Sequence, residues 1–137
     1  MPDDQAYCSL IKPEPGWVHW DKQAEILHGV SKSVLLEHGK EARLVAEQLN
    51  QLLQGKTVYS DAWGNDMSWI SLLFDQVDLL QRFTVDALHK LLSHEQQLQW
   101  DGVKKQVMLD TELKRHRASS DARMLQQTYC QTLALLA

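Results

Sequence analysis

Residues 66–93, DMSWISLLFDQVDLLQRFTVDALHKLLS, carry the clearest pattern in this 137-residue chain. Polar residues recur there every three or four positions, which is the repeat of an α-helix, and nearly every other position between Trp69 and Leu92 is apolar. A helix that is apolar around most of its circumference is normally packed from several sides. The pattern therefore predicts a central helix from Asp66 to Leu92 or Ser93. Its narrow polar face consists of Ser71, Asp75, Asp78, Arg82, Asp86, His89 and Ser93.

The positions of the prolines favour helices on both sides of this stretch. All three prolines precede residue 16, and the rest of the chain is rich in Leu, Gln, Ala, Glu and Lys, which form helices well. The segment Lys12-Pro13-Glu14-Pro15-Gly16 has the composition of a turn or an extended segment. We therefore expect an irregular leader over residues 1–16 and a single helical domain over residues 17–137.

The residues before the central helix predict one long helix followed by a loop. Apolar residues from Leu27 to Leu52 recur at helical spacing, and Gly55 is a natural stop, so the helix would be about 50 Å long. Gly39 weakens this helix and leaves a break near that position open. Residues 55–66, GKTVYSDAWGND, contain two glycines and several polar residues and are predicted to form a loop.

The residues after the central helix predict two further helices. Residues 95–117 have a weak apolar pattern, which indicates a peripheral helix with an interruption near Gly102. A last helix follows with Ser119 or Ser120 as its cap. The predicted fold class is therefore all-α, an up-and-down bundle of about four helices with an irregular N-terminal leader. One face of the last helix is predicted to consist of Leu125, Tyr129, Thr132 and Leu136.

Composition and the N-terminal residues indicate a protein of the cytoplasm. Hydrophobic residues make up 44% of the chain and charged residues 23%, as in ordinary globular proteins, and no apolar run reaches the length of a membrane span. The first ten residues have two aspartates where a signal peptide needs positive charge. Cys8 and Cys130 lie near opposite chain ends and form no metal-binding pattern, and a reducing compartment disfavours a disulfide between them.

Three local patterns resemble functional sites, and each fails on its motif or on its geometry. Residues 55–57, GKT, end like a phosphate-binding loop, but the first glycine of that motif is missing. The pairs Glu25–His28 and Asp86–His89 have the spacing of ligands in di-iron bundles, yet they fall on polar helix faces and would not converge in a core. We therefore predict no enzyme activity, no cofactor and no metal site.

Acidic and aromatic residues gather in the predicted loop and on the polar face of the central helix. They form either a solvated surface with modest ion pairs, in which Arg82 is spaced to pair with Asp78 and Asp86, or a docking surface for a basic partner. Loop aromatics are typical anchors of interfaces, whereas Trp69 and Trp100 are predicted to lie in the core. The residues predicted to bind a partner are Tyr59, Asp61, Trp63, Asp66, Asp75, Asp78, Arg82 and Asp86.

These features predict a non-enzymatic, cytoplasmic protein that binds another protein. Within that class we favour a small bacterial immunity or antitoxin-type inhibitor, or a chaperone or adaptor. A homodimer is compatible with the divergent apolar positions of the last two helices. The alternative function is that of a nucleic-acid-associated regulator that uses a basic C-terminal third. Its cationic residues are Lys104, Lys105, Lys114, Arg115, His116, Arg117 and Arg123.

Overall fold

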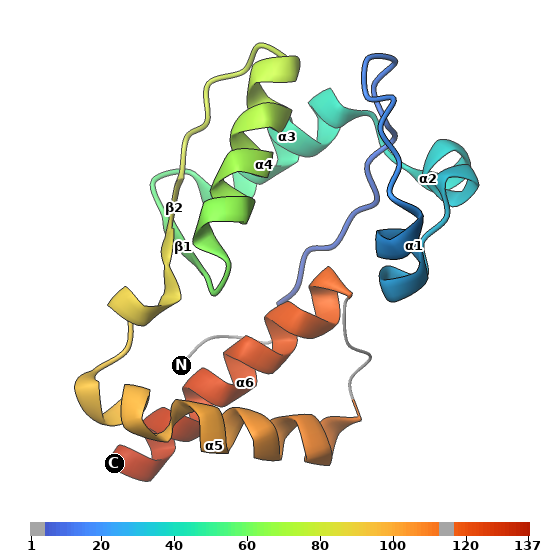
Figure 1. Ribbon diagram of the computed structural model, residues 1–137. Coiled ribbons are helices and arrows are strands. Elements are labelled where there is room, and N and C mark those ends of the chain that lie inside the picture. The colour runs from blue at the N-terminus through green and yellow to red at the C-terminus, as the bar shows by residue number, and fades with distance from the viewer. Residues whose placement is uncertain (1–4, 113–116) are drawn as a thin grey trace. The chain divides into compact units, whose positions relative to one another are not determined.

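The structure, a computed structural model, describes residues 5–112 and 117–137 (Figure 1). These residues divide into two compact units. The sheet unit comprises Ser9–Asp21 and Val30–Leu91, and the helical unit comprises residues 5–8, Lys22–Gly29 and Leu92–Ala137. The prediction of a leader over 1–16 and one domain over 17–137 stays a prediction.

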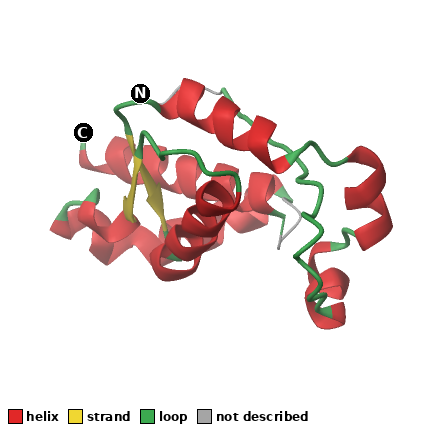
Figure 2. Ribbon diagram, turned by 90° about the horizontal axis from the view of Figure 1, so that it is seen from above, coloured by secondary structure: helices red, strands yellow, loops and turns green. Residues whose placement is uncertain are grey.

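The predicted all-α bundle of about four helices is wrong. The described residues form six α-helices and two short strands that pair in a small parallel sheet (Figures 1 and 2). In chain order the elements are α1 (Lys22–His28), α2 (Lys32–His38), α3 (Ala42–Leu53), β1 (Thr57–Ser60), α4 (Trp63–Gln76), β2 (Thr84–Ala87), the 3-10 turn η1 (Leu88–Lys90), α5 (His94–Thr111) and α6 (Ala118–Leu136).

The long first helix of the prediction is three separate helices, α1, α2 and α3. Gly29, with φ of 68°, follows α1, because a left-handed residue cannot continue a right-handed helix. Gly39 follows α2 at a place where another part of the backbone approaches closely. A Cβ atom on Gly39 would collide with the carbonyl oxygen of Leu35 and with the backbone of Lys12. Backbone hydrogen bonds of 2.8 Å join Lys40 to Leu10 and to Lys12.

Both strands lie where the sequence pattern predicted something else. β1 occupies the predicted loop, and β2 lies inside the predicted central helix. The two strands are parallel, with Thr57 opposite Thr84 and Val58 opposite Val85. Parallel strands need a crossover connection, which α4 supplies. The short segments TVYS and TVDA therefore depend on each other, since neither has a second strand to pair with in the described residues.

The central helix of the prediction ends sixteen or seventeen residues early, because α4 stops at Gln76. Asp78 has a φ of 54°, a left-handed conformation that aspartate tolerates better than most residues and that breaks the helix. The N–H of Leu79 then donates to the Phe74 carbonyl oxygen across the turn. The chain leaves the helix here and reaches β2 at Thr84.

The core of the sheet unit is apolar and joins α3, α4 and β2. The rings of Phe74 and Phe83 meet edge to face, with 5.8 Å between their centroids, a favourable arrangement for aromatic rings. Trp17 and Leu49 are among the partly buried residues packed against this core. Its buried members are Ala42, Val45, Ala46, Leu73, Phe74, Phe83 and Val85.

The helical unit contains α5 and α6, which pack against each other and run in opposite directions (Figure 1). α5 begins at a capping box in which Ser93 and Gln96 exchange hydrogen bonds. It continues through Gly102, so the predicted interruption there is wrong. α6 has Arg117 as its N-cap, rather than Ser119 or Ser120.

The buried face of α6 also differs from the predicted one. Its buried residues are Met124, Thr128 and Thr132, so Thr132 is the one member of the predicted face among them, whereas Leu136 is exposed. The Gln96 side-chain amide donates to Thr132 Oγ1 over 3.1 Å, which links α5 to α6 through a buried polar contact. Val107 on α5 is fully buried as well.

Candidate protein-binding surface

The segment from Thr57 to Gln81, which we call the acidic segment, contains β1, α4 and the turn after α4. It has four aspartates, Asp61, Asp66, Asp75 and Asp78, and no Lys, Arg or His. The sequence therefore places a local charge of -4 on one connected piece of the sheet unit. A surface of one sign attracts partners of the other sign and speeds their encounter.

The carboxyl ends of the two strands bring together several of the predicted site residues. Tyr59 lies opposite Asp86 in the strand register. Ser60 Oγ donates to Asp66 Oδ2 and accepts from the Ala62 N–H, so the start of α4 is tied to the end of β1. Asp61 lies directly after the strand and is exposed.

Trp63 is exposed over 45% of its surface, while its indole N–H donates to the Val85 carbonyl oxygen over 2.9 Å. The hydrogen bond fixes one edge of the ring on β2 and leaves much of the rest of the side chain in solvent. A rigid aromatic ring that is already held in place loses little conformational freedom when a partner covers it.

Asp86 pairs with Lys90 and not with Arg82. Lys90 Nζ lies 2.9 Å from Asp86 Oδ1, and the Ala87 N–H also donates to that oxygen over 2.8 Å. These two donors, Lys90 first, hold the pKa of the Asp86 carboxyl below its ordinary value. The predicted pairs of Arg82 with Asp78 and Asp86 need a continuous helix, and this helix does not exist in residues 77–83.

The remaining predicted residues lie elsewhere in the sheet unit. Asp75 is exposed near the end of α4, and Asp78 lies in the turn that follows. Asp75 lies nine positions after Asp66, which is about 14 Å along a helix axis. Arg82 precedes β2, where its backbone N–H donates to the Asn50 side chain and its carbonyl accepts from Gly55. The eight residues therefore form two groups at the two ends of α4, with Arg82 apart from Asp86.

The exposed face of α4 joins these two groups, and the sequence pattern missed it. Trp69 is 64% exposed and Leu72 is 54% exposed, so the prediction that Trp69 lies in the core is wrong. The core side of α4 is taken by Leu73 and Phe74 instead. Exposed residues recur at helical spacing around Trp69 and define what we call the α4 face: Asn65, Ser68, Trp69, Leu72, Asp75 and Gln76.

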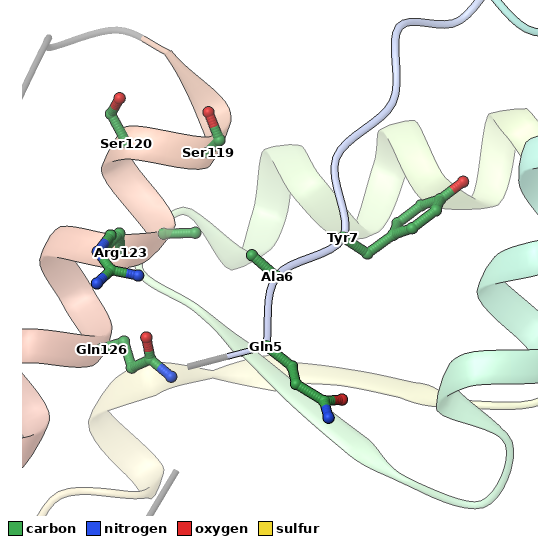
Figure 3. A pocket seen from close by; sticks show the side chains of 8 residues that line it. Gln5, Ala6, Tyr7, Ser119, Ser120, Arg123 and Gln126 are labelled. Carbon is green, nitrogen blue, oxygen red and sulfur yellow. The ribbon is translucent and has the colours of Figure 1, made fainter. Parts of the chain in front are cut away.

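The helical unit holds a pocket of about 490 Å³ between the N-terminal segment and the first turns of α6 (Figure 3). Gln5 and Tyr7 line one side, and Ser119, Ser120 and Arg123 line the other. The labelled polar side chains point in different directions, so they do not converge on one ligand position (Figure 3). Binding sites for small molecules normally have converging polar groups.

The described cations of the C-terminal third are spread over two helices. Lys104 and Lys105 lie on α5, Arg117 precedes α6 and Arg123 lies on α6. The predicted cations at positions 114–116 lie outside the described residues. No group of three or more potential metal ligands occurs in the described ranges 5–112 and 117–137.

Comparisons with other proteins give no relative. No protein-family model matches the chain, and no curated protein or solved structure matches it significantly. Within the part of the chain that the structure describes, no helix has the length and apolar character needed to cross a membrane.

Proposed function

We propose that this protein works by binding another protein, without catalysing a reaction, and that the acidic segment and the α4 face form the binding surface. The partner presents a basic surface. The complex forms in the cytoplasm, and the protein acts in it as an immunity or antitoxin-type inhibitor or as a chaperone or adaptor.

The observation that supports the proposal most is the exposed aromatic side chain of Trp69 within a segment that has four aspartates and no cation. Tryptophan is one of the residues enriched among those that dominate binding energy, and a partner that covers an exposed aromatic ring removes a large apolar area from water. Leu72 lies one turn further along the same face and extends the apolar part of the surface. Trp63, at the start of α4, adds a second exposed ring.

The charges around these rings suit a basic partner. Asp75 belongs to the α4 face, and Asp78 follows it in the turn. Acidic groups at the rim of an apolar patch increase the rate of association with a cationic surface and disfavour acidic proteins. The apolar residues then provide affinity, and the aspartates provide selectivity.

Neutralising Asp75 and Asp78 tests the charge requirement with little structural cost. Asp75→Asn changes an exposed side chain, and Asp78→Asn keeps a residue that tolerates the left-handed conformation. The matched control is Asp101→Asn with Glu112→Asn, because Asp101 is also an exposed helical residue and Glu112 is also left-handed, with φ of 49°.

The measurement is affinity capture from a host lysate, identification of the captured protein, and titration of that purified protein against each variant. We expect the double variant at Asp75 and Asp78 to bind about tenfold more weakly, a loss of about 1.4 kcal/mol, and the control pair to bind like the wild type. Equal affinities for both pairs, or a captured partner that is acidic, would overturn the proposal. Capture of nucleic acid alone would also overturn it.

A further inference from the structure

The two outer edges of the small sheet are chemically different. In a parallel pair, alternate residues of each strand direct both backbone groups toward the partner strand. The Thr84 N–H donates to the Lys56 carbonyl oxygen over 3.0 Å, and with Thr57 opposite Thr84 this fixes the alternation. Val58 and Ser60 therefore bond to β2, whereas the backbone N–H and C=O groups of Thr57 and Tyr59 point away from it.

Side chains bond three of the outward backbone groups along β2. The Phe83 carbonyl oxygen accepts from Gln81 Nε2 over 2.9 Å, and the Val85 carbonyl oxygen accepts from the Trp63 indole N–H over 2.9 Å. The N–H of Ala87 donates to Asp86 Oδ1 over 2.8 Å. Folded proteins commonly protect sheet edges in this way, because an open edge pairs with any strand that reaches it.

The outer edge of β1 has no such cover from any residue in the described ranges. Thr57 and Tyr59 are both exposed, and their outward N–H and C=O groups form no hydrogen bond with a described residue. Four backbone groups of this edge therefore have no partner among residues 5–112 and 117–137, enough for a short added strand. The contrast with β2 matters, since among the described residues side chains bond three outward backbone groups along β2 and none of β1.

Charge indicates which kind of strand this edge would accept. β1 belongs to the acidic segment, and Asp61 follows its last residue directly. Lys56 precedes the strand, so the negative charge lies at the carboxyl end. A partner strand with cationic side chains near that end would be attracted, whereas an acidic one would be repelled. The exposed Tyr59 ring offers an apolar contact for a side chain on the same face.

We infer that the outer edge of β1 accepts an extended, basic segment of the partner protein as a third strand. The inference rests on the proposed function, because it specifies how the basic partner attaches. Backbone pairing to Thr57 and Tyr59 supplies hydrogen bonds that do not depend on the partner's sequence, and the aspartates select cationic segments.

The test uses three synthetic peptides and amide hydrogen exchange measured by NMR on the whole protein. The first peptide is acetyl-KVKVKV-amide, the second is the same peptide with every backbone nitrogen methylated, so that neither of its edges can donate, and the third is acetyl-EVEVEV-amide. Methylation keeps the charge and the side chains but blocks strand pairing through the methylated positions. We expect saturating acetyl-KVKVKV-amide to slow exchange at Thr57 and Tyr59 at least tenfold, while the other two peptides leave both amides unchanged.

A second variant separates strand pairing from simple attraction. Tyr59→Pro removes one outward N–H and no hydrogen bond to β2, so we expect it to bind the KVKVKV peptide at least tenfold more weakly than Tyr59→Ala does. Equal binding of the methylated and unmethylated peptides, or unchanged exchange at both amides, would overturn the inference. The proposed function would survive that result if Asp75→Asn with Asp78→Asn still weakened capture of the natural partner. Protection that rises with protein concentration without peptide would assign the edge to a second copy of the chain and would likewise overturn the inference.

Discussion

The sheet unit and the helical unit bury different kinds of side chains. The buried core of the sheet unit consists of apolar residues, centred on the paired rings of Phe74 and Phe83. The described core of the helical unit includes Gln96, Thr128 and Thr132, all almost fully buried. An apolar core is stabilised in proportion to the area it removes from water, whereas a buried polar contact is stabilising only while both partners are present. The two units should therefore respond differently to small changes.

The largest effect is expected from Phe74→Ala in the sheet unit. Phe74 is 2% exposed, and its removal leaves a cavity beside Phe83, so the variant should lose about 3–5 kcal/mol of unfolding free energy. Trp69→Ala on the same helix is the control, because an exposed aromatic should cost less than about 1 kcal/mol. Denaturant titration followed by circular dichroism measures both. Comparable losses for the two variants would contradict the assignment of the core side of α4.

In the helical unit, Thr132→Val tests the buried polar contact between Gln96 and Thr132. It keeps the shape of the side chain and removes the acceptor of the Gln96 amide, so a buried donor is left without that partner and about 1–3 kcal/mol is lost. The double variant Gln96→Leu with Thr132→Val removes both polar groups of this contact and should lose less than the sum of the two single variants, although Gln96→Leu also removes the capping hydrogen bond from the Ser93 N–H. A double variant as unstable as the sum of the single variants would show that the pair has no energetic coupling.

Two glycines should respond to alanine with opposite signs. Gly39→Ala places a methyl group against the backbone of Lys12 and should destabilise the sheet unit by about 1–3 kcal/mol. Gly102→Ala adds a methyl group in open space within α5 and should stabilise the helical unit by about 0.5–1 kcal/mol. Thermal unfolding of both variants gives the signs. A stabilising Gly39→Ala would refute the close approach of residues 12 and 39.

The smallest effect concerns acid pH. The pKa of Asp86 is lowered in the folded protein, so the contribution of its contact with Lys90 is complete above the ordinary aspartate pKa and is lost as the pH falls through the folded-state pKa. Asp86→Asn removes this contribution. The free energy of unfolding of the variant should therefore fall less steeply as the pH drops into the acid range, and its pH dependence near neutral pH should stay the same. Denaturant midpoints measured in parallel from neutral to acid pH provide the test. Superimposable profiles would show that the carboxylate is not stabilised by the fold.

The comparison of the units also explains which features could be predicted from the sequence. Both helices of the α5–α6 pair were expected from local spacing, although Ser93, which caps α5, was assigned to the end of the central helix. The sheet depends on pairing between the segments TVYS and TVDA, which lie 27 positions apart. Helical periodicity compares residues three or four positions apart and therefore cannot detect such a pairing. Their β-branched and aromatic residues were the available signal.

The candidate surface was predicted only in part, again because the prediction relied on helical periodicity. The aspartates of the acidic segment were read directly from the sequence, but their arrangement assumed one helix through Asp78, where the chain turns instead. That assumption also placed Trp69 in the core, because a helix packed from several sides has no exposed apolar face. Since α4 is shorter and covers only a small sheet, one of its faces is left exposed. The partner of Asp86, Lys90, lies four residues along the chain, a spacing that could have indicated the pair.

The most direct test of the central claim, that the α4 face binds a protein partner, is the affinity of the purified partner for Trp69→Ala. The control is Leu98→Ala, which removes an apolar side chain of the helical unit that is 75% exposed. We predict that Trp69→Ala weakens binding about thirtyfold, or about 2 kcal/mol, as for a dominant interface residue, and that Leu98→Ala binds like the wild type. Unchanged affinity of Trp69→Ala, with the variant folded, would contradict the claim.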